Sequence, residues 1–155
     1  MTELAYTPRG LYFEDFALGT RLRTAGLTIT EADIVAFAGL SGDFNQIHTN
    51  AEYAAADTFG RRVAHGLLVQ SIATGLAVQS GVIEGTVLAF RELDAKFSLP
   101  VYIGDTIHVA IEIVETKPFP RLRGGNVVMK YAVINQKGET AQRGNWTMLV
   151  KSRGA

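Results

Sequence analysis

The segment from Gly66 to Val82 constrains the fold most, because it is apolar on nearly every side of a helix. A helix of this kind has to be buried over most of its surface. It is too short and too polar for a membrane span, with about 17 residues where a bilayer needs roughly 20 mostly apolar ones. Its apolar residues are Leu67, Leu68, Val69, Ile72, Leu76, Ala77 and Val78, and its polar ones are Gln70, Ser71, Thr74 and Gln79. The segment is therefore expected to be a core helix.

After Gly85 the pattern changes to a period of two, which is typical of β-strands with one buried face. Residues 107–113 alternate in this way, and the runs 127–134 and 141–150 flank a turn at 135–138. Pro100 and the pair Gly104-Asp105 divide residues 85–108 into at least two further strands. One buried helix is best covered by one face of a curved antiparallel sheet, so an α+β domain is predicted.

Composition limits the classes of partner. The 155 residues suit one domain, 1–155, with a loosely ordered lead-in over 1–11. The 15 basic and 15 acidic residues cancel, and no positive field is present to hold nucleic acid or an anionic membrane. The absence of cysteine excludes disulfides, thiol nucleophiles and thiolate metal sites. The first residues lack the basic and apolar regions of a signal peptide, which makes the cytoplasm the expected compartment.

The first half of the chain predicts a strand near residues 20–28 and then two helices. Thr30 and Asp33 resemble a capping pair at the start of the first helix, which Gly39 and Gly42 interrupt. Thr49 or Asn50 can cap a short helix over residues 51–56. The residues between the two helices are expected to form a loop.

Asp43 and His48 flank that loop. On a continuous helix, five residues would place their side chains about 140° apart, whereas a loop can bring them together. Gly42 gives the backbone freedom, and Asn45 can brace the turn through hydrogen bonds to the main chain. An aspartate and a histidine can hold one water and exchange its protons near neutral pH. The alternative is an aspartate at a helix end beside a surface histidine.

The second candidate is Ala64-His65-Gly66, at the entry to the buried helix. The first N–H groups of a helix lack internal partners and carry the positive end of its dipole, so they can hold an oxyanion such as a thioester enolate. Gly66 would let a substrate carbonyl approach closely. The alternatives are that Gly66 permits tight packing and that His65 caps the helix.

Other residues give weaker signals. His108 lies on the polar side of an alternating strand and is expected to face solvent. The three histidines show no metal-ligand spacing, so no metal is predicted. The pairs Arg61-Arg62 and Arg121, Arg123 can either hold phosphates of a cofactor handle or belong to a solvated surface.

The segment Ser41-Gly42-Asp43-Phe44-Asn45-Gln46-Ile47-His48 resembles the hydratase signature of MaoC-like dehydratases and (R)-specific enoyl-CoA hydratases. The resemblance extends to Ala64-His65-Gly66-Leu67-Leu68, to Tyr12-Phe13-Glu14-Asp15-Phe16 and to residues 99–105, and therefore covers nearly the whole chain. It implies a hot-dog fold, in which an antiparallel sheet wraps a long helix, and a homodimer or higher homo-oligomer with acyl-thioester tunnels near the interface.

The resemblance also implies roles for individual residues. Asp43 and His48 are similar to the family's catalytic pair, and Asn45 to the asparagine that shapes their loop. Gly66 is similar to the backbone donor of the oxyanion hole, with His65 as its neighbour in a supporting position. Thr74 falls where some members place a hydroxyl residue. The family usually has proline where this chain has Gln46, a departure that loses a fixed φ but no proton-transfer group.

The implied reaction is reversible addition of water to a trans-2-enoyl thioester, giving an (R)-3-hydroxyacyl thioester. The acyl group would be carried by coenzyme A or an acyl carrier protein, and no redox cofactor or metal is implied. The fold also hosts thioesterases, and fold alone does not choose between the two activities. A non-catalytic subunit that binds acyl thioesters is a third interpretation, against which stands the presence of both Asp43 and His48.

Overall fold

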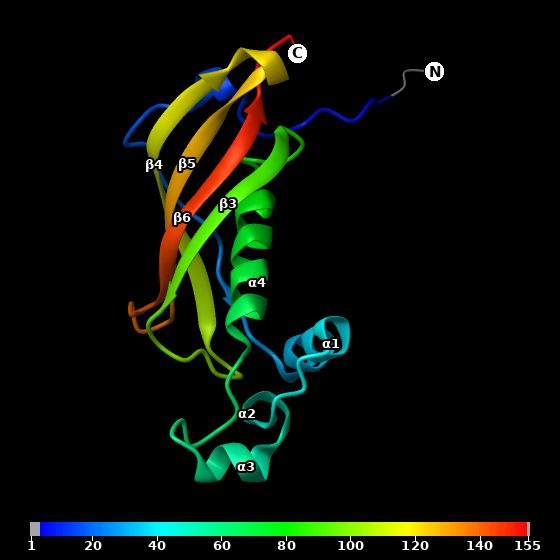
Figure 1. Cartoon of the computed structure of the whole chain (residues 1–155), viewed down its shortest axis with the longest axis vertical. Coiled ribbons are helices and arrows are strands. Elements are labelled where there is room, and N and C mark those ends of the chain that lie inside the picture. The colour runs from blue at the N-terminus through cyan, green and yellow to red at the C-terminus, as the bar shows by residue number, and fades with distance from the viewer. Residues whose placement is uncertain (1–3, 155) are drawn as a thin grey trace.

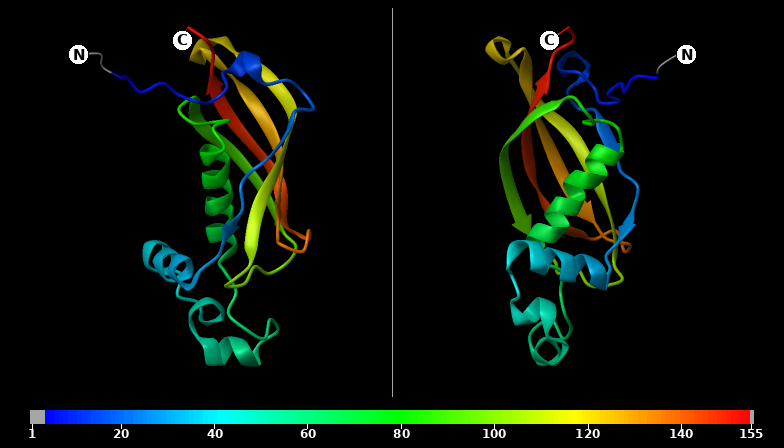
Figure 2. Two further views of the ribbon diagram at one scale, coloured as in Figure 1. Left: turned by 180° about the vertical axis from the view of Figure 1, so that it is seen from behind. Right: turned by 90° about the vertical axis from the view of Figure 1, so that its right-hand side faces the viewer.

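The computed structural model describes residues 4–154 and consists of a curved antiparallel sheet packed against one long helix, α4 (Gly66–Gln79). Figure 2 shows α4 lying along the concave side of the sheet in both views. The strand order is β1-β4-β5-β6-β3, and β2 pairs with β4 outside this path. The strands are β1 (Arg21–Arg23), β2 (Leu27–Thr28), β3 (Val87–Phe97), β4 (Thr106–Phe119), β5 (Gly124–Ile134) and β6 (Thr140–Lys151). The predicted α+β architecture is confirmed.

The core lies between α4 and the concave face. Along residues 106–113 of β4 and 125–134 of β5 every second side chain is buried, and the antiparallel register places Ile111 opposite Tyr131. From α4 the side chains of Ala73, Leu76 and Ala77 are buried against this layer. The period of two in the sequence therefore identified the buried face correctly. None of the helices within residues 4–154 has the length and apolar character needed to cross a membrane.

The helices of the first half are α1 (Glu31–Ser41), α2 (Gln46–Thr49) and α3 (Ala51–Ala56), which gather beyond the N-terminal end of α4 (Figure 1). Thr30 and Asp33 form the predicted capping box of α1, and the Asn50 side chain caps α3 by accepting from the Tyr53 N–H. The prediction of an unbroken loop between α1 and α3 is wrong, because α2 forms a single helical turn there. The first strand is also split into β1 and β2.

The C-terminal end of α4 differs by three residues from the sequence-based expectation. The helix stops at Gln79 because the chain turns at Ser80 and Gly81. The φ of Gly81 is 87°, a left-handed value that suits glycine. The following segment receives the N-terminal lead-in, since Gly10 and Leu11 donate backbone N–H bonds to Glu84 and Val82.

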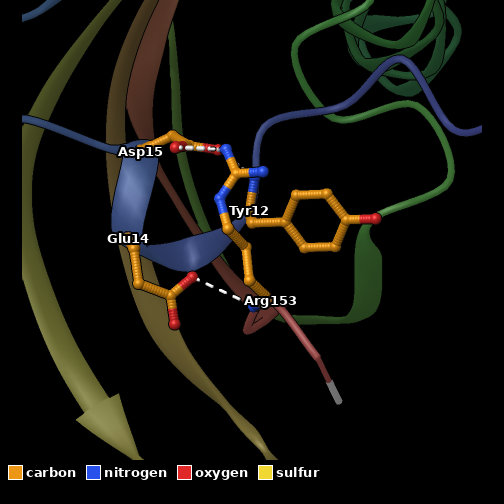
Figure 3. Close-up of polar contacts among 4 residues, drawn as sticks. All are labelled: Tyr12, Glu14, Asp15 and Arg153. Atoms are coloured by element: carbon orange, nitrogen blue, oxygen red, sulfur yellow. Dashed lines mark hydrogen bonds and ion pairs between the residues drawn. The ribbon is translucent and has the colours of Figure 1, made fainter.

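The C-terminus is tied to η1 (Phe13–Asp15) by Arg153, as Figure 3 shows. The Arg153 guanidinium bonds to the Asp15 carboxylate at 2.6 Å and lies 5.0 Å from the centre of the Tyr12 ring. The Arg153 backbone N–H also donates to Glu14. The hydrogen bond from Arg153 holds the pKa of Asp15 below its usual value. Residues 12–15 and the last residues of the described chain are thereby joined at one end of the sheet.

Strand β3 is an edge of the sheet and carries an exposed apolar surface. Leu88, Phe90, Leu93 and Phe97 are each between 44% and 55% exposed. Exposed apolar patches on an edge strand are typical of surfaces that pair with another chain.

Candidate functional site

The loop that carries Asp43 is shaped by its neighbours. Helix α1 ends at Ser41, and Gly42 caps it with a left-handed φ of 78°. The predicted interruption at Gly42 is confirmed, whereas Gly39 lies inside the helix. The Asn45 N–H donates to the Asp43 carboxylate at 3.2 Å, and the Asn45 side-chain oxygen accepts from the Ile47 N–H at the start of α2. The chain thus reverses between Asp43 and His48. One carboxylate oxygen of Asp43 and one ring nitrogen each of His48 and His65 lie within 4.8 Å of one another.

His48 lies on α2 and is 7% exposed. Its Nδ1 is 2.7 Å from the carbonyl oxygen of Val63. A carbonyl only accepts, so Nδ1 carries the hydrogen and Nε2 of the neutral ring keeps a lone pair. This tautomer leaves a proton acceptor in the wall of the cavity that His48 lines.

His65 immediately precedes α4 and is only 2% exposed. The interpretation that it caps the helix is wrong for the side chain, which makes no capping bond. Instead, its Nε2 donates to the backbone carbonyl of Asp43 at 2.9 Å. The ring also stacks on His48 with 3.8 Å between centroids. The imidazole is buried because it packs between the Asp43 loop and α4. The sequence pattern does not reveal this contact.

A cavity of about 630 Å³ adjoins His48 and the start of α4. Apart from His48, Gly66, Ser98 and Gln142 its lining is apolar. These apolar residues are Ile47, Phe59, Val63, Ala64, Leu67, Val69, Phe97, Leu99, Pro100 and Val101. A mostly apolar cleft with a few polar groups suits an acyl chain with a polar head.

Gly66 begins α4 at the edge of this cavity, and within residues 4–154 its N–H has no acceptor. A Cβ added at Gly66 would lie 2.7 Å from the Phe97 ring, so the glycine also allows close packing. The two interpretations of Gly66 are therefore compatible. Gln142 of β6, which the sequence analysis missed, donates from Nε2 to the Gly66 carbonyl at 2.9 Å. The sequence signal that could have identified Gln142 is a polar residue at an inward-facing position of a strand.

The remaining candidates lie elsewhere. Thr74 is about 12 Å further along α4 from Gly66, at 1.5 Å per residue, and its hydroxyl donates to the Ser71 carbonyl at 2.8 Å. His108 is half-buried on β4, and burial together with the charge of Arg23 lowers its pKa. The structure therefore brings His65, but neither Thr74 nor His108, to the Asp43–His48 pair.

The arginine pairs have separate environments. Arg62 bonds to Glu31, which holds the pKa of Glu31 below its usual value, and the Arg61 guanidinium lies 3.8 Å from the centre of the Tyr102 ring. Arg121 and Arg123 lie in and just after η2 (Pro120–Leu122).

The fold creates a possible metal-ligand spacing that the sequence did not reveal, in the group formed by Asp43, His48 and His65. One ring nitrogen of each histidine is bonded to a backbone carbonyl. Such a bond orients an imidazole equally well for proton transfer or for metal binding. The absence of a metal in the reaction remains a prediction.

Comparison with known proteins places this geometry in context. The family described as MaoC like domain matches residues 15–136. The (R)-specific enoyl-CoA hydratase of Rhodospirillum rubrum is 33% identical over 143 residues, covering 92% of this chain and 94% of that protein. Protein MaoC of Klebsiella aerogenes is 43% identical over 100 residues, which are 64% of this chain but only 30% of that longer protein.

Solved structures agree with this. A monoamine oxidase regulatory protein from Archaeoglobus has a TM-score of 0.84 at 37% identity, covering 92% of this chain and 95% of its own. A Mycobacterium tuberculosis protein with a double hotdog fold has a TM-score of 0.81 at 21% identity, covering 96% of this chain and 46% of its own. The second likeness shows the fold alone, and the arrangement of α4 and its sheet is a hot-dog fold.

Proposed function

The chain belongs to the MaoC-like domain family, and from this membership and the site geometry we propose that it is an (R)-specific enoyl-thioester hydratase. It adds water reversibly to a trans-2-enoyl thioester, with coenzyme A or an acyl carrier protein as the carrier, and gives an (R)-3-hydroxyacyl thioester. The name of the Rhodospirillum rubrum relative supports this proposal, because that relative and this chain align over nearly their whole lengths.

One observation carries the proposal. His48, whose Nε2 keeps a lone pair, and Gly66, whose N–H has no acceptor within residues 4–154, line the same cavity, and the Asp43 carboxylate lies within 4.8 Å of His48. A base and an oxyanion donor on one apolar cleft are the two components that conjugate addition to a thioester needs.

The chemistry follows from these positions. A water held between Asp43 and His48 loses a proton to Nε2 of His48, and its oxygen forms a bond to C3 of the substrate. The C2=C3 electrons move onto the thioester carbonyl, whose oxygen becomes an enolate held by the Gly66 N–H. Protonation of C2 from the protonated pair then completes the addition. Because the two groups share one water, their protonation steps are coupled and belong to the pair.

The test follows loss of the conjugated enoyl-thioester absorbance with crotonyl-CoA and longer enoyl-CoAs. Removal of a general acid or base costs roughly 10²- to 10⁴-fold in rate, so Asp43→Asn and His48→Gln should each fall by at least about 10²-fold. His108→Gln is the matched control, since His108 lies outside the cavity lining, and should keep the full rate. Full rate in both Asp43→Asn and His48→Gln would exclude the assignment.

The products distinguish the competing activities. Chiral analysis should find the (R)-3-hydroxyacyl thioester. Release of free thiol without loss of the conjugated bond would identify a thioesterase instead. Tight binding of acyl-CoA with no turnover at any chain length would identify a non-catalytic binding subunit.

The same proposal includes a homodimer. The exposed leucine and phenylalanine side chains of the β3 edge support pairing with a second copy, which would continue the sheet across the interface.

A further inference from the structure

His65 is one of the most deeply buried polar residues near the site, yet the proposed reaction gives it no proton to carry. It stands immediately before Gly66, at the junction between the Asp43 loop and α4. It contacts the backbone of Asp43 and the ring of His48. That assignment rests on the proposed hydratase function.

The first contact fixes the loop. Asp43, Phe44 and Asn45 are all exposed, so little packing holds this segment in place. The His65 Nε2 hydrogen bond to the Asp43 carbonyl, at 2.9 Å, ties the backbone of this segment to the start of α4. Because a carbonyl only accepts, the hydrogen must be on Nε2.

The second contact fixes the base. The His65 ring lies 3.8 Å from the His48 ring at an interplanar angle of 27°, and the Phe37 ring lies 5.0 Å from His65. The His48 ring is thus held between its own bond to the Val63 carbonyl and the face of His65. One side chain therefore contacts both members of the proposed catalytic pair.

A contribution to folding stability does not explain why this buried position holds a histidine. Its Nδ1 is buried without a hydrogen-bond partner among residues 4–154, and leaving a buried polar atom unpaired costs folding free energy. A phenylalanine would keep an aromatic ring at this position without that cost. The Nε2–H donor is the feature that a phenylalanine would lack.

We infer that His65 is a positioning residue that fixes the Asp43 loop and the His48 ring relative to the Gly66 oxyanion donor. It touches no reacting atom. Its Nε2–H sets the placement of the Asp43 backbone, and its ring face sets the plane of the His48 imidazole. Misplacement of reacting groups by about 1 Å can cost on the order of 10²-fold in rate.

Two variants separate the donor from the ring. His65→Phe keeps an aromatic face and removes the donor, whereas His65→Gln keeps an N–H donor at a similar reach and removes the ring. With crotonyl-CoA, kcat of His65→Phe should fall about 10- to 100-fold while KM changes less than about twofold. His65→Gln should also lower kcat, because it removes the ring face against His48, while it keeps a donor for the Asp43 carbonyl. Thermal unfolding of His65→Phe should occur at or above the wild-type temperature.

A second measurement does not depend on turnover. Amide hydrogen exchange at Asn45, whose N–H bonds to the Asp43 carboxylate, should become at least about tenfold faster in His65→Phe and change less in His65→Gln. His108→Phe is the control and should leave this amide unchanged. An inactive wild-type enzyme would refute the hydratase proposal, while the exchange rates would still test the tie.

The inference is overturned by any of three results. These are wild-type kcat in His65→Phe, which lacks the donor, wild-type kcat in His65→Gln, which lacks the ring face, and unchanged Asn45 exchange in His65→Phe. Loss of activity that simply follows loss of folded protein would also refute a positioning role.

Discussion

The oxyanion donor can be tested by a double-mutant cycle at Gly66 and Phe97. In Gly66→Ala the new methyl group would lie 2.7 Å from the Phe97 ring, so the ring has to move by about 1 Å to reach an ordinary contact distance near 3.5 Å. Phe97 is 55% exposed, which makes this movement inexpensive. The overpacking cost of about 1 kcal/mol is offset by the roughly 0.4 to 1 kcal/mol that alanine contributes over glycine by restricting the unfolded chain. The free energy of unfolding should therefore change by less than about 1 kcal/mol.

Activity should respond differently from stability. If the thioester carbonyl approaches the Gly66 N–H closely, the methyl group obstructs it, and kcat/KM for crotonyl-CoA should fall about 10- to 100-fold. This fall corresponds to about 1.4 to 2.7 kcal/mol of transition-state stabilisation.

Phe97→Ala removes the ring that the methyl group would strike. It should therefore relieve any strain measured by chemical denaturation. It should not restore the rate of Gly66→Ala beyond the effect of Phe97→Ala by itself. Recovery of the rate in the double variant would show that Gly66 serves only to accommodate Phe97, and the oxyanion argument would fail.

Three further changes test other parts of the structure. Gln46 is the first residue of α2, and Asn45 before it has φ −52° and ψ 136°, a conformation compatible with a following proline. Gln46→Pro should raise the free energy of unfolding by about 0.4 to 1 kcal/mol without changing kcat/KM, and a loss of stability would show that α2 cannot accept the ring. Arg153→Met should lower the melting temperature near neutral pH, because Arg153 holds the pKa of Asp15 below its ordinary value of 3.8. The stability that this lowered pKa contributes is fully present at pH values above 3.8 and is lost as the pH falls through the pKa of Asp15 in the folded protein. The gap between variant and wild type should close in acid, and a constant gap down to pH of about 2 would contradict the linkage. Leu93→Glu, on the exposed β3 edge, should convert the proposed dimer to monomers in sedimentation velocity, and an unchanged dimer would locate the interface elsewhere.

The parts of the fold that the sequence predicted are those with long, regular patterns. The buried α4 and the alternating strands β4, β5 and β6 were expected from periodicity, because each extends over at least 11 residues. Helix α2 was missed because its four residues are too few to show a helical period. The end of α4 was misplaced because Val82 continues the apolar pattern after Gly81 has already turned the chain.

The site divides in the same way. The proximity of Asp43, Asn45 and His48 could be predicted because their loop is local, and their roles stay a prediction. The His65 bond to Asp43 spans 22 residues, and the Gln142 bond to Gly66 spans 76. No pattern in a single sequence encodes such contacts, since they depend on how α1, α4 and β6 pack. Thr74 was expected near the site from the resemblance, but it lies more than two turns along α4 from Gly66 and away from Asp43 and His48.

The two histidines join the Asp43 loop to the start of α4 by hydrogen bonds, one donated from each segment to the other. His48, which follows the Asp43 loop, donates to the Val63 carbonyl just before α4, while His65 at the start of α4 donates to the Asp43 carbonyl. Both acceptors belong to the backbone, so they persist when the side chain of Asp43 is changed. Asp43→Asn should therefore leave the His65 tie in place. A fall in its rate with unchanged exchange at the Ile47 amide, whose N–H bonds to the Asn45 side chain, would report loss of a proton-transfer group rather than collapse of the loop.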